Sequence, residues 1–168
     1  RAGDYATHVL HDPFNDPIIR ALRENDLTNA PEQKVKVVFV PVYLDGEDGI
    51  FDLSYYDLLI GFDLSVFPSY YEPWGYTPLE SIAFGVPTIT TSLAGFGLWV
   101  RENFTDQKSV CVIERNDDND QEVIQNIAEA ISFYSHCDAS CKKAINDKAV
   151  EISQHALWTH LYDNYLAA

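Results

Sequence analysis

Strand-like and helix-like segments alternate through the middle of the chain, and this alternation constrains the fold more than any other feature. Three short runs rich in β-branched or aromatic residues, Leu64–Pro68 (LSVFP), Pro87–Thr91 (PTITT) and Ser109–Glu114 (SVCVIE), have the pattern of buried strands. A helical segment that ends at Gly85 separates the first two, and a longer amphipathic segment begins at Asp120. Strands that alternate with helices at this spacing predict an α/β fold, with a parallel sheet covered by helices on both faces.

The flanking segments extend the same pattern. Val35–Val40 (VKVVFV) is stopped by a proline and is predicted to be a further buried strand. Asp16 and Pro17 have the residue types of an N-cap and a first helical position, which predicts a helix there. Ser54–Gly61 is expected to form a short helix closed by its glycine. Two more amphipathic helices are expected at the C-terminus, after the segment that begins at Asp120.

The composition bounds the domain and excludes some partners. The 168 residues, 46% of them hydrophobic, suffice for one domain with a buried core and are too apolar for a mainly disordered chain. The net charge of −15 argues against nucleic acid and anionic membrane surfaces as partners. No apolar run reaches the roughly 18 residues of a membrane span. The chain begins at Arg1 and contains no methionine, so residues 1–168 are expected to be a single domain, incomplete at its N-terminus, of a longer protein.

The three cysteines, Cys111, Cys137 and Cys141, are an odd number in a chain that opens without a secretory signal. This favours reduced thiols in a cytoplasmic protein. Cys137 and Cys141 lie close to His136 in the sequence, which could suggest a metal site. No second pair of ligands has the spacing of a zinc site, so a helix with two surface thiols is favoured and no metal is expected.

The stretch Ser69–Glu80 (SYYEPWGYTPLE) is the most unusual part of the sequence, because it crowds aromatics, prolines and two carboxylates around one glycine. It follows a predicted strand, and ligands of parallel α/β sheets bind at the carboxyl ends of strands. One interpretation is purely structural. Thr77, Pro78 and Glu80 fit a capping box, with the threonine as N-cap, the proline at the first helical position and the glutamate reaching back.

A second interpretation makes the same stretch a binding site. Gly75 lets the main chain approach a ligand closely, and the first N–H groups of the following helix form an anion site suited to a phosphate. Glu72 and Glu80 would flank that anion, and carboxylates accept hydrogen bonds from hydroxyl groups. A ligand with a diphosphate between two hydroxyl-bearing ends, such as a nucleotide sugar, fits this arrangement. The local pattern leaves both interpretations open.

The sequence resembles a known family in this region. The segments VFPSYYEPWGYTPLE, which ends at Glu80, and GVPTITTSLAGFG, which ends at Gly97, are similar to the glycogen synthases of the animal and fungal type. The resemblance is densest from Phe62 to Gly97 and extends more loosely to Thr7–Pro13 and Val35–Val40. It implies a retaining glucosyltransferase of family 3 with the GT-B fold, in which two Rossmann-like domains face a cleft. The chain would be the C-terminal, nucleotide-sugar-binding domain, followed by its C-terminal helical segments.

The resemblance also implies an activity. Glucose would be transferred from UDP-glucose to the 4-hydroxyl end of an α-1,4-glucan with retention at the anomeric carbon, without a metal or other cofactor. Helix-terminus amides and basic side chains would balance the charge of the leaving diphosphate. The partners implied are the nucleotide sugar, the glucan acceptor and the N-terminal domain of the same chain.

Individual positions match residues of the family. Glu72 matches the glutamate that contacts the hydroxyls of the donor glucose and helps to hold it for transfer, which makes it the catalytic candidate. Glu80 matches the glutamate that binds the ribose hydroxyls. Four residues match the loop whose backbone N–H groups meet the diphosphate: Trp74, Gly75, Tyr76 and Thr77.

Two more positions are implied by the resemblance. Tyr55, counted back from Glu72 without gaps, falls where the family stacks a tyrosine on the uracil; a tyrosine that only packs its own helix is the alternative. Gly95, Phe96 and Gly97 would border the same cleft.

The charge distribution departs from what a diphosphate needs. No lysine or arginine lies between Lys36 and Arg101, whereas eight acidic residues do. A helix terminus contributes about 0.3–1 kcal/mol towards an anion, and millimolar binding already needs about 4 kcal/mol. The resemblance implies that an arginine and a lysine upstream of Arg1, and residues of the N-terminal domain, supply the remainder. Residues 1–168 alone are therefore expected to be inactive.

A second departure concerns regulation. Eukaryotic members carry an arginine-rich helix that binds the activator glucose 6-phosphate, but Phe133–Ser153 holds three lysines and no arginine. We therefore expect no activation by glucose 6-phosphate, since lysine lacks the bidentate donors of arginine. The same absence fits a bacterial member. Two alternatives remain open: a retaining transferase that uses ADP-glucose or another acceptor, and a non-catalytic module that keeps the fold.

Overall fold

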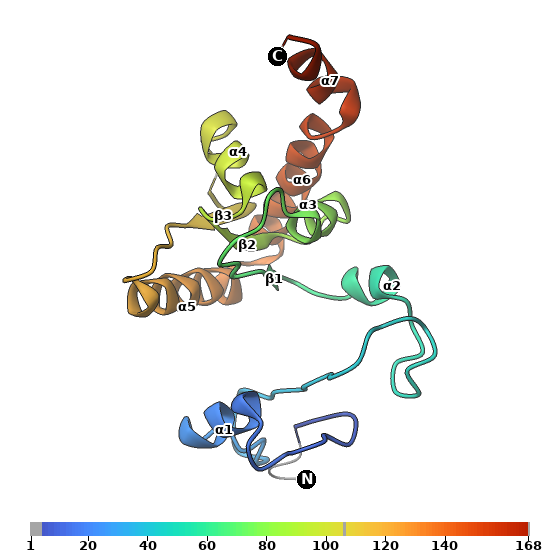
Figure 1. Cartoon of the computed structure of the whole chain (residues 1–168), viewed down its shortest axis with the longest axis vertical. Helices are drawn as coiled ribbons and strands as arrows, with labels where there is room; N and C mark the ends of the chain where they lie inside the picture. The colour runs from blue at the N-terminus through green and yellow to red at the C-terminus, as the bar shows by residue number, and fades with distance from the viewer. Residues whose placement is uncertain (1–4, 106, 168) are drawn as a thin grey trace. The chain divides into compact units, whose positions relative to one another are not determined.

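The computed structural model of the chain describes residues 5–105 and 107–167 (Figure 1). These residues divide into two compact units, one up to Tyr56 and one that begins at Asp57. Each unit has its own helices. In the described residues, no helix is both long enough and apolar enough to cross a membrane.

The N-terminal unit contains the helix α1 (Pro17–Glu24), which begins where the sequence predicts. The Asp16 carboxylate accepts hydrogen bonds from the N–H groups of Ile18 at 2.9 Å and Ile19 at 3.0 Å. Pro17 takes the first helical position, where its missing N–H costs nothing. Ile19 is buried, so this helix packs through one face.

The prediction of a buried strand at Val35–Val40 is wrong. In this unit the segment is extended but forms only a single parallel bridge, between Phe39 and Ala6. Val35 is 59% exposed and Val38 63% exposed. A buried parallel strand needs neighbouring strands at both edges and cover on both faces. The described residues of this unit give Val35–Val40 neither.

The acidic loop that follows is closed by an antiparallel bridge between Asp45 and Ser54. The helix α2 (Tyr55–Leu59) comes directly after it and ends in a turn at Gly61. This confirms the short glycine-closed helix that the sequence predicts.

The C-terminal unit is built on a three-stranded parallel sheet with the order β1-β2-β3. Its strands are β1 (Ser65–Val66), β2 (Thr88–Thr91) and β3 (Val110–Ile113). In the central strand β2, Thr88 pairs with Ser65 of β1 on one side and with Val110 of β3 on the other. The three strands lie at the segments that the sequence predicts, and their parallel arrangement confirms the α/β class.

Helices cover both faces of this sheet, as predicted. Side chains alternate along β3: Val110 packs in a core with Phe96, Val100 and Ile152, and Ile113 packs on the other face. Figure 1 shows α5 on the opposite side of the strands from α4. The helices of the unit are α3 (Tyr76–Ala83), α4 (Gly95–Asn103), α5 (Asp120–His136), α6 (Ala139–His155) and α7 (Trp158–Ala167).

The helices α5, α6 and α7 confirm the predicted C-terminal helical segments. The helix α4 is an addition that the sequence pattern does not predict, since its first turn contains two glycines. The cysteines Cys111, Cys137 and Cys141 are free thiols.

Candidate functional site

The stretch Ser69–Glu80 runs from the loop that connects β1 to α3 into the first turns of α3, at the carboxyl ends of the strands. The loop runs beside the segment that follows β2. The N–H of Glu72 donates to the carbonyl of Leu93 at 3.1 Å, and the carbonyl of Glu72 accepts from the N–H of Gly95 at 3.1 Å. The N–H of Phe96 donates to the carbonyl of Trp74 at 2.6 Å. The main chain of the loop is therefore fastened to the start of α4.

The starts of the neighbouring helices α3 and α4 differ in whether their first N–H groups have partners in the loop. The first N–H groups of α4 are used by the carbonyls of Glu72 and Trp74. The helix α3 begins after Gly75, whose φ of +110° is rarely adopted by a residue with a β-carbon, and no side chain caps it. The start of α3 is therefore the better place for an anionic ligand.

The predicted capping box is wrong in its position. Because α3 begins at Tyr76, Thr77 and Glu80 are its second and fifth residues rather than the N-cap and the third residue. Gly75 explains the difference, since its left-handed backbone starts the helix two residues earlier than a threonine cap would. Pro78 falls within the first four residues, whose N–H groups have no partner inside the helix.

The Glu72 carboxylate lies beside the start of α3. The hydroxyl of Ser69 donates to Glu72 Oε2 at 3.2 Å. A β-carbon placed on Gly75 would lie 3.5 Å from the same oxygen and 3.3 Å from Pro78 Cγ. The structure thus brings Glu72, Gly75 and the first turn of α3 together. Glu80 is half-buried one turn further along the same helix.

The aromatic side chains of the stretch divide between packing and exposure. The ring of Trp74 lies 5.9 Å from the rings of both Phe96 and Trp99, within the core on one face of the sheet. Trp74 is only partly buried there, and it also lines the pocket that Tyr76 and Trp158 share. Tyr76 is 67% exposed. With Trp158 and residues of α3 and α7, it lines a pocket of about 400 Å³ beside the start of α3.

The glycines of the GFG segment are required by close packing. A β-carbon on Gly95 would lie 2.2 Å from the carbonyl oxygen of Pro73, and one on Gly97 would lie 2.3 Å from that of Thr91. Phe96 is fully buried. The GFG segment lies next to the candidate site, and its contact there is with the backbone of the 72–74 loop.

Tyr55 belongs to the N-terminal unit, so the structure does not place it relative to Glu72. Its ring makes an edge contact with the ring of Tyr56 at 5.3 Å and is half-buried. The proposed stacking on a uracil remains a prediction.

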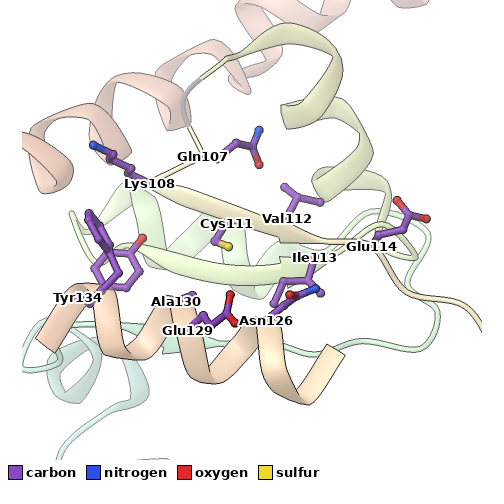
Figure 2. Close-up of a pocket in the computed structure, with 11 residues that line it drawn as sticks. Gln107, Lys108, Cys111, Val112, Ile113, Glu114, Asn126, Glu129, Ala130 and Tyr134 are labelled. Carbon is purple, nitrogen blue, oxygen red and sulfur yellow. The ribbon is translucent and has the colours of Figure 1, made fainter. Parts of the chain in front are cut away.

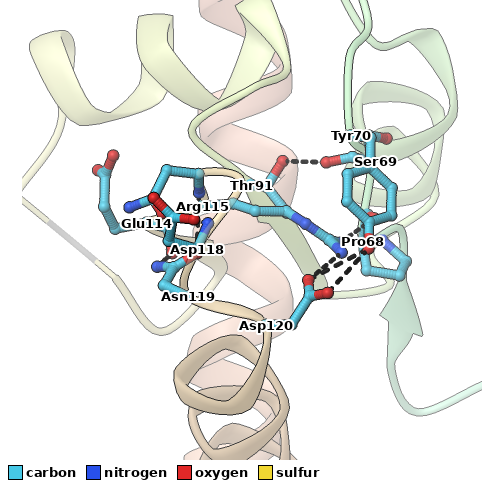
Figure 3. A network of polar contacts seen from close by, with 10 residues as sticks. Pro68, Ser69, Tyr70, Thr91, Glu114, Arg115, Asp118, Asn119 and Asp120 are labelled. Atoms are coloured by element: carbon cyan, nitrogen blue, oxygen red, sulfur yellow. Dashed lines mark hydrogen bonds and ion pairs between the residues drawn. The ribbon is translucent and has the colours of Figure 1, made fainter.

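Arg115 lies just after β3 and is not predicted from the sequence pattern as part of the site. Its side chain is 7% exposed and is the centre of the polar network in Figure 3. It contacts the loop at Pro68 and Tyr70 and forms an ion pair with Asp120 at 3.0 Å. An arginine within the acidic sequence ERNDDND carries no local signal of burial.

The basic side chains of the C-terminal unit are all engaged with other side chains of the described residues. Four lysine or arginine residues besides Arg115 form ion pairs, and Lys108 lies 5.5 Å from the centre of the Phe133 ring. The four ion pairs are Arg101 with Glu114, Lys142 with Asp63, Lys143 with Asp147 and Lys148 with Glu151. Among the described residues of the C-terminal unit, no basic side chain is therefore committed to the start of α3.

A second pocket of about 400 Å³ lies between β3 and α5 (Figure 2). Cys111, Ile113 and Ala130 are among its lining residues. Burial raises the pKa of the Cys111 thiol, which keeps it protonated near neutral pH. None of the predicted site residues lines this pocket. Among residues 5–105 and 107–167, no group of three or more His, Cys, Asp or Glu side chains could hold a metal ion.

The fold and the site together define a Rossmann-like α/β domain, in which a glycine-started helix and polar groups gather at the carboxyl ends of parallel strands. The family model of glycogen synthase matches residues 3–168. The chain belongs to the glycogen synthase family.

The chain is also similar to individual members. It is 41% identical over 133 residues to glycogen (starch) synthase of Caenorhabditis elegans, a match that covers 78% of this chain and 20% of the relative. It is 39% identical over 127 residues to glycogen (starch) synthase isoform 1 of Saccharomyces cerevisiae. That match covers 73% of this chain and 18% of the relative. It is 31% identical over 159 residues to the liver glycogen (starch) synthase of Mus musculus. That match covers 92% of this chain and 22% of the relative. The chain spans about a fifth of the length of these relatives.

Proposed function

We propose that the chain is the donor-binding part of a retaining glucosyltransferase of the glycogen synthase type. The full enzyme transfers glucose from UDP-glucose to the 4-hydroxyl end of an α-1,4-glucan. The observation that carries this proposal is the uncapped, glycine-started helix α3, with the Glu72 carboxylate beside its first turn, in a member of this family.

Each group has a role in the proposed reaction. The N–H groups at the start of α3 bind the diphosphate. Glu80 accepts hydrogen bonds from the ribose hydroxyls, and Glu72 accepts them from the donor glucose. Tyr55 stacks on the uracil. The bond between the anomeric carbon and the diphosphate oxygen breaks while the acceptor oxygen bonds to the same face of that carbon, and the acceptor proton leaves with the diphosphate.

The charge of the leaving diphosphate is balanced only in part by this chain. The helix start supplies about 0.3–1 kcal/mol, or up to about 2 kcal/mol when partly buried. The lysines and arginines of the C-terminal unit are engaged elsewhere. We propose that basic side chains outside the described residues, including an N-terminal domain, complete the site without a metal ion.

The test is a titration of the full-length protein with UDP and with ADP, for wild type and Glu80→Ala. Glu102→Ala is the matched control, because Glu102 is an exposed glutamate on the neighbouring helix α4. Loss of hydrogen bonds to two hydroxyls should weaken UDP binding at least about tenfold in Glu80→Ala, with no change in the control. Equal UDP binding by all three proteins would remove Glu80 from the site. Preferential binding of ADP would instead favour an ADP-glucose-dependent transferase.

A further inference from the structure

The side chain of Arg115 connects three parts of the carboxyl edge of the sheet. Its Nη1 donates to the carbonyl of Pro68 at 2.7 Å, and its Nη2 donates to Asp120 Oδ1 at 3.0 Å. Its guanidinium carbon lies 3.4 Å from the centre of the Tyr70 ring. The hydroxyl of Tyr70 in turn donates to Asp120 Oδ1 at 3.1 Å, which closes the network (Figure 3).

This network continues to the Glu72 carboxylate. Pro68 and Tyr70 are the sequence neighbours of Ser69. The carbonyl of Ser69 accepts a hydrogen bond from Thr91 Oγ1 at 2.7 Å. The hydroxyl of Ser69 donates to Glu72 Oε2 at 3.2 Å. The position of Ser69, and through it one oxygen of Glu72, is thus set from one side by β2 and from the other by Arg115.

The main chain also holds the two ends of this loop, where the N–H of Phe67 donates to the carbonyl of Ile89 at 2.8 Å and the N–H of Glu72 donates to that of Leu93 at 3.1 Å. The strand β1 is only two residues long. Tyr70 is 61% exposed and Tyr71 80% exposed, so burial of apolar surface does little to hold this segment. Arg115 is 7% exposed, and its Nε has no partner in the part of the chain that the structure describes. A buried cation with an unsatisfied donor is costly, and the other side-chain contacts of Arg115 go to Pro68, Tyr70 and Asp120.

We propose that Arg115 is a positioning residue, which fixes the loop Pro68–Glu72 and thereby aims the Glu72 carboxylate at the donor glucose. This rests on the proposed function. A lysine cannot replace it, because one ammonium group cannot bridge the Pro68 carbonyl and Asp120 while lying flat on the Tyr70 ring. The residue acts on the transferred sugar and leaves the nucleotide-binding start of α3 unchanged.

The test uses the full-length enzyme and the variants Arg115→Lys and Tyr70→Phe, the second of which keeps the ring but removes its bond to Asp120. Arg101→Lys is the matched control, since Arg101 is an arginine in an exposed ion pair with Glu114. We expect kcat with UDP-glucose to fall at least about tenfold in Arg115→Lys. The dissociation constant of UDP, which lacks the glucose, should stay within about twofold of the wild-type value. Tyr70→Phe should fall between wild type and Arg115→Lys, and the control should match wild type.

A double-mutant cycle with Glu72→Gln separates positioning from general stability. If Arg115 acts through Glu72, Arg115→Lys has little further effect on kcat in the Glu72→Gln background. Equal fold losses in both backgrounds, or parallel loss of UDP binding and thermal stability, would overturn the proposal. Absence of UDP binding in the wild type would instead refute the proposed function itself, so the two failures are distinguishable.

Discussion

The carbonyl of Trp74 accepts a hydrogen bond of 2.6 Å from the N–H of Phe96, and this contact joins the 72–74 loop to the start of α4. Together with the bond from the N–H of Gly95 to the carbonyl of Glu72, it uses main-chain donors at the start of α4. In the described residues, no side chain caps the neighbouring start of α3. The backbone contacts of the 72–74 loop therefore distinguish the two helix starts.

Gly95→Ala should be strongly destabilising. Its new β-carbon would lie 2.2 Å from the Pro73 carbonyl oxygen, so either the loop or α4 must move. We expect the free energy of unfolding in urea to fall by about 2–3 kcal/mol. In Gly61→Ala, the matched control, the closest contact is 3.2 Å and the change should be smaller. Equal stability of Gly95→Ala and wild type would show that the packing of α4 on the loop is loose.

Gly75→Ala should weaken nucleotide binding as well as stability. A residue with a β-carbon at a φ of +110° is strained by about 1–3 kcal/mol, and the new methyl group would approach Glu72 Oε2 and Pro78 Cγ. We expect a measurable loss of UDP affinity by calorimetry in the full-length protein. Gly85→Ala is the control, since Gly85 also has a positive φ, of +76°, but ends α3 rather than starting it. Similar losses of UDP affinity in both variants would argue against a ligand at the start of α3.

The sequence predicts the sheet well because β1, β2 and β3 lie in short runs rich in β-branched or aromatic residues, which is the pattern of buried strands. It fails at Val35–Val40, where the same local pattern cannot reveal whether partner strands are present. The sequence pattern misses α4 because its first turn contains Gly95 and Gly97, and glycine is a poor helix former. Both glycines are required by close contact with the main chain of other segments, at Pro73 and Thr91.

The candidate site is predicted in part for the same reason. The family motif and the chemistry of helix starts identify Glu72, Gly75 and Glu80, because these are properties of contiguous residues. The role of Arg115 could not be predicted from the sequence, because its contact with Pro68 joins residues 47 positions apart. The start of α3 is misplaced by two residues because the capping-box pattern ignores the left-handed backbone that Gly75 permits.

The ion pair between Arg101 and Glu114 should give stability that depends on pH. Hydrogen bonds from Arg101 and then Ser92 hold the pKa of Glu114 below its ordinary value. Because the folded pKa is depressed, this contribution is present above the unfolded pKa, near 4.5, and is lost as pH falls through the folded pKa. Both side chains are largely exposed, so Arg101→Gln should cost under about 1 kcal/mol at pH 7. Chemical denaturation at pH 7 and pH 3 tests this, and an equal cost at both values would contradict it.

The full-length enzyme should not be activated by glucose 6-phosphate. The three lysines of α6 are engaged within the C-terminal unit: Lys142 with Asp63 at 2.8 Å, Lys143 with Asp147 at 2.5 Å and Lys148 with Glu151 at 2.6 Å. None of them offers the paired donors with which arginine binds a phosphate. Glucosyl transfer measured with and without millimolar glucose 6-phosphate should differ by less than about twofold. A several-fold activation would show that another part of the enzyme supplies the phosphate site.

Residues 1–168, produced alone, should not transfer glucose. The start of α3 provides at most about 2 kcal/mol towards the diphosphate, against the roughly 4 kcal/mol that millimolar affinity requires. The lysines and arginines of the C-terminal unit are engaged with Glu114, Asp120 and other partners. The measurement is release of UDP from UDP-glucose with a maltooligosaccharide acceptor, with the full-length enzyme in parallel and the folding of the fragment checked by circular dichroism. Turnover by the pure fragment would contradict this prediction and would show that residues 1–168 hold a complete diphosphate site.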